Sequence, residues 1–128
     1  MKRNNTIDAF FALLRAGLWE EDTCLSSYGE IEFEKVYNLA EEQSVVGLIA
    51  AGLEHIQDVK VPQEIALTFV GSTVQLEQRN AAMNVFVARL IEDLRANGVY
   101  ALLVKGQGIA ECYERPQWRA SGDVVFFF

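Results

Sequence analysis

The spacing of apolar residues changes near residue 98, and this change constrains the fold more than any other feature of the sequence. Before it, apolar residues recur every three or four positions, as they do in amphipathic helices. After it come two short continuous apolar runs, 99–104 and 124–128, which are typical of strands covered on both faces. We therefore expect an α+β protein that is mainly α, with a helical region over 1–97 and an α/β segment over 98–128.

The helical region contains turn and cap signals that divide it into separate helices. The first is expected to start at Asn5 or Thr6, since both residue types cap helix N-termini. Two further helices are predicted over 31–42 and 45–53, with Ser44 as the cap of the second.

The longest helical pattern runs from Pro62 to Asn97. Proline suits the first turn of a helix because its missing N–H would have no partner there. Gly71, Ser72 and Thr73 have the lowest helix propensity in this stretch, so we expect a kink or break at these residues. Asn97 followed by Gly98 predicts a helix end with a residue in the left-handed conformation.

Charge and hydropathy exclude several functional classes. The formal net charge is -7, and residues 1–104 account for it with 15 acidic and 8 basic residues. Such a surface argues against broad capture of a nucleic-acid backbone, which requires a basic face. No run of 18 apolar residues is present, so the sequence predicts no membrane-spanning helix.

The cysteines and the histidine exclude other kinds of site. Cys24 and Cys112 lack the spacing of metal ligands, and we expect two reduced, partly buried thiols in a cytoplasmic protein. His55 is the only histidine in the sequence, and we expect neither a histidine-dependent triad nor a metal site with several histidine ligands. We expect it to lie on or near the surface.

The residues that indicate chemistry begin at Lys105-Gly106-Gln107-Gly108, a glycine turn between a predicted strand and a short predicted helix. Such turns let backbone amides approach phosphate closely. A dinucleotide fingerprint requires Gly or Ala where this chain has Glu111, and a P-loop requires lysine after the glycine, not before it. A third interpretation is a nucleotidyltransferase core, in which the next strand carries two carboxylates at i and i+2 on one face to hold Mg²⁺.

Seven residues extend the third interpretation to a specific family. The sequence resembles a bacterial family of uncharacterised nucleotidyltransferases with a KG…Y…P…R…GDID pattern, and it is similar to the N-terminal half of a full-length member. The matching residues are Lys105, Gly106, Tyr113, Pro116, Arg119, Gly122 and Asp123. The resemblance implies nucleotidyl transfer from Mg-NTP to an unidentified acceptor. It further implies that Lys105, Gly106 and Arg119 contact the nucleotide and that Asp123 is a metal ligand.

The sequence departs from this pattern at Val125, which stands where the family carries its second acid. A valine cannot ligate a metal, and the third carboxylate of the family is expected on a later strand. We therefore expect a truncated chain with an incomplete Mg²⁺ site and little or no catalytic activity. The alternative is a non-catalytic helical interaction module that completes its sheet by self-association through 124–128, since an unpaired apolar strand exposes an edge.

Overall fold

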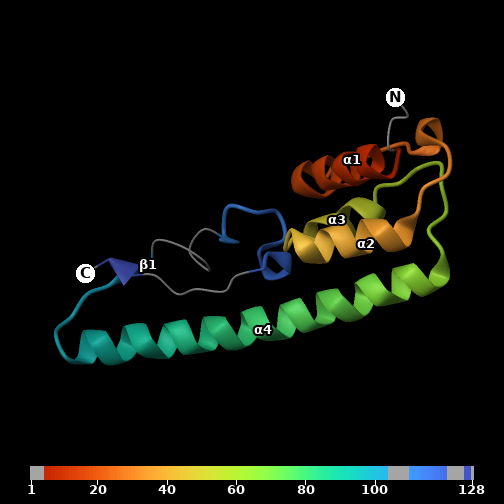
Figure 1. Cartoon of the computed structure of the whole chain (residues 1–128). Helices are drawn as coiled ribbons and strands as arrows, with labels where there is room; N and C mark the ends of the chain where they lie inside the picture. The colour runs from red at the N-terminus through yellow and green to blue at the C-terminus, as the bar shows by residue number, and fades with distance from the viewer. Residues whose placement is uncertain (1–4, 104–109, 121–125, 128) are drawn as a thin grey trace. The chain divides into compact units, whose positions relative to one another are not determined.

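Four α-helices make up most of the chain in the computed structural model, which describes residues 5–103, 110–120 and 126–127 (Figure 1). The expected fold class, α+β and mainly α, is confirmed. Contacts divide the chain into two compact units, residues 1–74 and 75–128. The division at residue 97 that the sequence predicts for the two functional regions stays a prediction.

The first unit is helical, and its helices follow the predicted pattern closely. Its elements are α1 (Asn5–Trp19), the 3₁₀ turn η1 (Ser26–Tyr28), α2 (Phe33–Glu42), α3 (Val46–Leu53) and the first part of α4 (Gln63–Ala96). The largest fully buried side chains of this unit come from all four helices and from the loop before η1: Leu13, Leu25, Val36, Ile49 and Phe69. The rings of Tyr37 and Phe69 meet edge to face, with 5.0 Å between their centroids.

Helices α1 and α3 pack against each other through two glycines. A Cβ atom at Gly17 would lie 1.8 Å from the carbonyl oxygen of Leu48, and one at Gly52 would lie 2.1 Å from that of Leu13. Both distances are far below van der Waals contact, so each backbone can approach the other only because glycine has no side chain.

A matched pair of substitutions tests this packing. Gly17→Ala should lower the free energy of unfolding by about 1–3 kcal/mol, since the new methyl group must force the two helices apart. Gly71→Ala should raise it by about 0.5–1 kcal/mol, because this glycine is inside α4 and an added Cβ would meet no atom within 4 Å beyond its neighbours and the nearby helix backbone. Urea unfolding of both variants measures the difference, and a shift of the same sign in both would contradict the packing described.

The start of α3 corrects one prediction. Ser44 does not cap this helix, because the N-cap is Val45, which makes no side-chain cap hydrogen bond. Ser44 instead has a φ of 58° and ends α2 in the left-handed conformation. The Val45 N–H then donates to the carbonyl of Ala40 at 2.9 Å, and that bond closes the turn. An N-cap residue has an extended backbone, so Ser44 cannot cap α3 while its own backbone is in the left-handed conformation.

His55 joins two loops of the first unit. Its Nε2 contacts the carboxylate of Glu20 and its Nδ1 lies 3.4 Å from Asp22 Oδ1, while the Thr23 N–H donates to the His55 carbonyl at 2.9 Å. The hydrogen bond that the imidazole donates to the Glu20 carboxylate raises the pKa of His55 above its usual value of 6.5, and Asp22 adds to this effect. The side chain is 20% exposed, which agrees with the expected position near the surface.

The raised pKa predicts how stability depends on pH. The folded state binds the imidazole proton more tightly than the unfolded state, so this contribution is fully present below pH about 6.5 and is lost as pH rises through the folded-state pKa. His55→Gln should therefore destabilise the protein more at pH about 5.5 than at pH about 8.5. Urea unfolding of both proteins at the two pH values tests this, and an equal difference at both would contradict it.

Of the kink or break expected at residues 71–73, the break is absent, because α4 runs continuously from Gln63 to Ala96. Both hydroxyl groups in this stretch have partners that are compatible with a helix. Ser72 Oγ lies 2.8 Å from the Tyr37 hydroxyl, and Thr73 Oγ1 donates to the carbonyl of Val70 at 2.9 Å. Neither hydroxyl therefore competes for the backbone N–H groups that a helix needs, and the low helix propensity of the segment does not end α4.

The second unit begins within α4, whose end is the predicted one. Gly98 has a φ of 76°, its N–H donates to the carbonyl of Arg95, and the Val99 N–H donates to that of Leu94 at 2.8 Å. This pair of bonds is the Schellman arrangement. The other elements of the unit are β1 (Leu102–Leu103), the 3₁₀ turn η2 (Pro116–Trp118) and β2 (Phe126–Phe127).

The two short strands pair antiparallel, with Leu102 opposite Phe127 and Leu103 opposite Phe126. Strands were expected here, but β1 is not covered on both faces, because Leu102 is 63% exposed. Among the described residues the sheet has two strands, and a ribbon of this width has no second layer to cover it.

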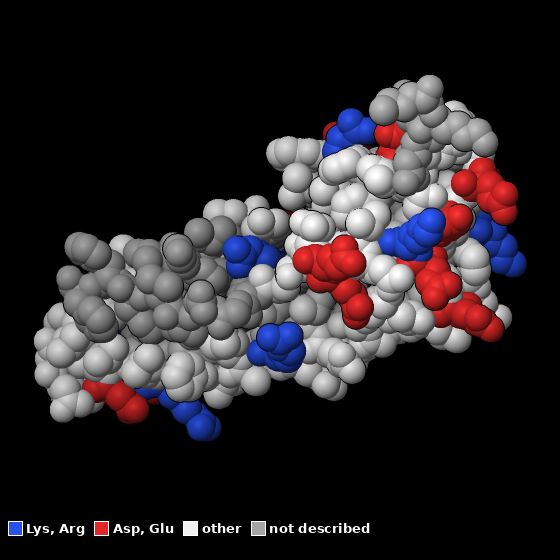
Figure 2. Space-filling model, in the orientation of Figure 1, with Lys and Arg blue, Asp and Glu red and all other residues white. Residues whose placement is uncertain are grey.

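The two units differ in charge. The first unit has twelve acidic and five basic residues, whereas the second has six of each. On the face drawn in Figure 2, acidic side chains gather over the part that carries α1 to α3.

Cys24 and Cys112 form no disulfide, as expected, but both are exposed and not partly buried, since each lies in a loop or turn. None of the described helices combines the length and the apolar composition needed to cross a membrane.

Candidate functional site

The motif segment, residues 110–120 of the second unit, contains the described part of the sequence motif. This segment carries Tyr113, Pro116 and Arg119, and its turn at Ala110 is closed by a hydrogen bond from the Tyr113 N–H at 3.0 Å. The other predicted site residues, Lys105, Gly106 and Asp123, and the departing position Val125 lie outside the described residues.

Asn80 of α4 holds this segment through its side-chain amide. The Nδ2 group donates to the carbonyl of Gln117 at 2.5 Å and to that of Arg119 at 2.9 Å. Asn80 is 4% exposed, so both bonds form where water does not compete with them. One buried side chain therefore uses both of its N–H donors to fix the backbone on either side of Trp118.

A second contact fixes the ring of Trp118. Its indole Nε1 donates to Glu77 Oε1 at 2.6 Å, and Glu77 lies on α4 one turn before Asn80. The guanidinium carbon of Arg115 lies 4.6 Å from the centroid of the same indole ring. Pro116 starts the intervening 3₁₀ turn, where proline needs no N–H partner. The indole is thus held at its edge by a carboxylate and on its face by a cation.

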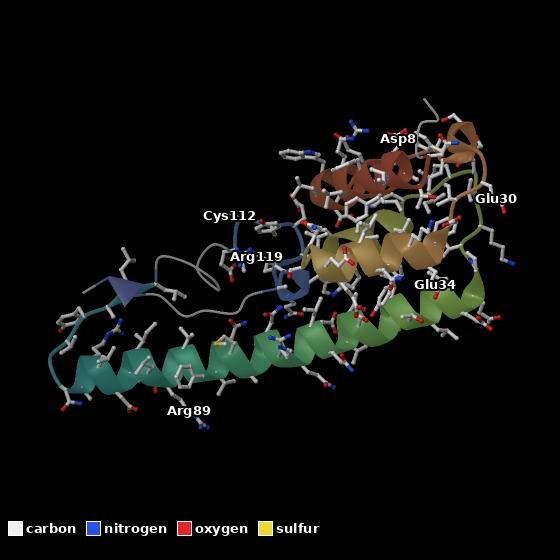
Figure 3. All side chains as sticks on the ribbon, viewed as in Figure 1. Asp8, Glu30, Glu34, Arg89, Cys112 and Arg119 are labelled. Atoms are coloured by element: carbon white, nitrogen blue, oxygen red, sulfur yellow. The ribbon has the colours of Figure 1, made fainter. Side chains whose placement is uncertain are left out.

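Arg119 is the predicted nucleotide-contacting residue that the structure describes (Figure 3). Its guanidinium carbon lies 5.5 Å from the centroid of the Tyr113 ring, within the range of a cation–π interaction. The structure thus brings together two residues of the sequence motif that are six positions apart. A guanidinium offers planar, paired N–H donors that suit phosphate oxygens, and stacking on an aromatic ring restricts its orientation.

Sequence reasoning missed Asn80 and Glu77. Their partners lie 37 to 41 residues away, so no local motif connects them. One signal was present in the sequence: Asn80 lies seven residues after Thr73 and seven before Val87, and all three are buried positions of α4. A polar residue in the middle of such a stripe must find a partner, and this requirement points to a buried hydrogen-bonding role.

The donor set does not fit the Mg²⁺ site that the resemblance implies. A two-metal site requires at least two carboxylates on one face, and the sequence offers Asp123 with a hydrocarbon side chain two positions later. Within residues 5–103 and 110–120, no group of three His, Cys, Asp or Glu side chains is arranged to hold a metal ion.

Comparison with known proteins identifies the family. A family model described as "Uncharacterised nucleotidyltransferase" matches residues 29–127. The chain therefore belongs to this family of nucleotidyltransferases, whereas the KG…Y…P…R…GDID motif and the bacterial origin stay predictions. Neither the curated proteins nor the solved structures yield a match.

Asn80→Ala should detach the motif segment from α4. The variant loses two hydrogen bonds and leaves the carbonyls of Gln117 and Arg119 without this donor, which should cost about 1–3 kcal/mol. Hydrogen exchange at the Tyr113 and Trp118 amides should accelerate. The control is Gln78→Ala, an exposed change on the same helix, and equal exchange in the two variants would contradict the anchoring role.

Proposed function

We propose that this chain binds a nucleoside triphosphate, as a nucleotidyltransferase of its family, and that its transfer activity is low. The observation that carries the proposal is the family match over residues 29–127, which includes the whole of the motif segment. The arrangement of Arg119 supports it, because a backbone fixed by Asn80 and a guanidinium stacked on Tyr113 present a preordered cation to a phosphate group.

The proposed division of roles follows the sequence motif. Lys105 and the backbone at Gly106 contact the triphosphate together with Arg119, since lysine, glycine amides and arginine are the groups that bind phosphate oxygens. Asp123 is the single carboxylate that the motif offers to a metal ion. The acceptor is a hydroxyl-bearing molecule whose identity the motif does not specify.

Val125 is the reason for the low activity in this proposal. Residues two positions apart in a strand share a face, so the motif expects a second carboxylate beside that of Asp123. The hydrocarbon side chain of valine cannot ligate a divalent cation, so this strand offers one carboxylate where the motif has two, which weakens the donor set for Mg²⁺. We derive no catalytic step through a metal for this chain.

The proposal includes a cytoplasmic location. Cys24 and Cys112 form no disulfide. Free thiols support this location, because the cytoplasm keeps thiols reduced.

A second candidate function is self-association through the short sheet. Leu102 is 63% exposed in β1, and a ribbon of two short strands is marginally stable without further strands or a covering layer. A second copy could add strands at its edges and bury this surface. In this case the thermal stability of the nucleotide-free protein would rise with protein concentration, whereas a nucleotide-binding monomer would respond to nucleotide and not to concentration.

Restoring the missing acid tests the nucleotidyltransferase proposal. The wild-type chain should bind NTP but transfer label from α-labelled NTP to acceptors only weakly with Mg²⁺ or Mn²⁺ present. Val125→Asp should strengthen Mg²⁺ binding, measured by calorimetry, because it supplies the second carboxylate. Val124→Asp is the matched control, since it adds the same charge next to position 125 and the predicted strand would place adjacent residues on opposite faces.

The same protein preparations give the contradicting outcomes. Strong metal-dependent transfer by the wild-type chain would overturn the low-activity part of the proposal, and equal Mg²⁺ binding by the two aspartate variants would overturn the role of position 125. Arg119→Gln should weaken NTP binding about tenfold, as expected for loss of a charge-assisted hydrogen bond. Arg89→Gln serves as the charge-matched control, because Arg89 projects from the side of α4 away from the motif segment (Figure 3). If the wild-type chain binds no NTP, the proposed function is wrong.

A further inference from the structure

A cleft of about 390 Å³ lies within the second unit, between α4 and the motif segment. Its volume is within the range of small-molecule sites, roughly 300–1,000 Å³. The side chains around it are mainly polar, and one of them is an indole ring. The lining residues are Asn80, Asn84, Ala110, Glu111, Arg115, Pro116, Gln117 and Trp118.

Two of the lining side chains have hydrogen-bonding groups available to a ligand. Asn84 lies one helical turn after Asn80 on the same face of α4, and Glu111 follows the turn at Ala110. Both are exposed, and within the described part of the chain neither side chain hydrogen-bonds to another group. The amide offers a donor and an acceptor, and the carboxylate offers acceptors.

The charges of the cleft favour a neutral ligand with amine donors over a phosphate. Among the described lining residues, the carboxylate is Glu111 and the guanidinium is Arg115, which already lies over the Trp118 ring. A phosphate group in this part of the cleft would be repelled by the Glu111 carboxylate. A planar heteroaromatic ring can instead stack on the guanidinium or the indole and direct its polar edge to Asn84 and Glu111.

We propose that this cleft binds the base of the nucleoside triphosphate, and that the base is an adenine-type ring read by Asn84. An asparagine amide pairs with adenine through two hydrogen bonds, accepting from the exocyclic amine and donating to a ring nitrogen. Glu111 provides a further acceptor for an amine proton. This inference rests on the proposed function and assigns the base specificity of the same site.

Asn80 connects the base cleft with the residue proposed to bind phosphate. Its side chain lines the cleft, and the same amide donates to the carbonyl of Arg119 at 2.9 Å. A nucleotide whose base occupies the cleft and whose phosphates extend to Arg119 would therefore contact two parts of one rigidly held segment. The cleft and the phosphate contact then form a single nucleotide site.

The fluorescence of Trp118 reports on the cleft without any enzymatic reaction. Trp19→Phe leaves Trp118 as the only tryptophan, and Trp19 is 65% exposed, so the change should be tolerated. In this background, adenosine and ATP should both quench the emission, whereas inorganic tripolyphosphate should not. ITP, which lacks the exocyclic amine, should bind about tenfold more weakly than ATP.

Paired amide-to-carboxylate changes on α4 test the role of Asn84. Asn84→Asp removes the N–H donors and should weaken ATP binding about tenfold, while its effect on tripolyphosphate binding should be small. Gln78→Glu adds the same charge to the same helix outside the cleft and should leave ATP binding unchanged.

The outcomes separate this inference from the proposed function. If adenosine and ATP leave the Trp118 emission unchanged and Asn84→Asp binds ATP as the wild type does, the base site is wrong. The proposed function would still stand in this case if tripolyphosphate displaced bound ATP and Arg119→Gln weakened binding. If adenosine quenches the emission in an Asn84-dependent manner but neither ATP nor tripolyphosphate binds through Arg119, the base site stands and the proposed function is wrong.

Discussion

The described site depends on the two hydrogen bonds that the Asn80 amide donates to the carbonyls of Gln117 and Arg119. The amide is 4% exposed, so these carbonyls gain a partner where water is excluded. The contact between the Trp118 indole and Glu77 is a further polar link between this segment and α4. The same side chain lines the adjacent cleft and fixes the backbone at Arg119, so it contributes to both.

The periodicity of the sequence was sufficient to predict the helices, because the buried stripe of each helix determines where it packs. The end of α4 was predicted as well, since an Asn-Gly pair specifies a local backbone conformation that Gly98 adopts. The expected break near Gly71 was wrong for a reason outside local propensity. Ser72 finds its partner in Tyr37, 35 residues away, and a single sequence does not reveal such a contact.

The candidate site, too, could be predicted only in part, because some of its contacts join residues far apart in the sequence. Tyr113, Pro116 and Arg119 could be named from their order along the chain, and the structure brings the Arg119 guanidinium to the Tyr113 ring. The place of Asn80 in a buried stripe of α4 indicated a hydrogen-bonding role, but its partners could not be predicted, because backbone carbonyls leave no residue-specific signal in the sequence. The exposure of Leu102 was also missed, since an apolar run indicates a strand but not how many layers cover it.

The central claim is that the segment held by Asn80 forms a nucleotide site together with α4. Hydrogen exchange of the full chain with and without saturating ATP tests it most directly. The account predicts slower exchange at the amides of Tyr113, Trp118 and Arg119, with no change in α3. Unchanged exchange throughout residues 110–119, or protection confined to the first unit, would contradict it.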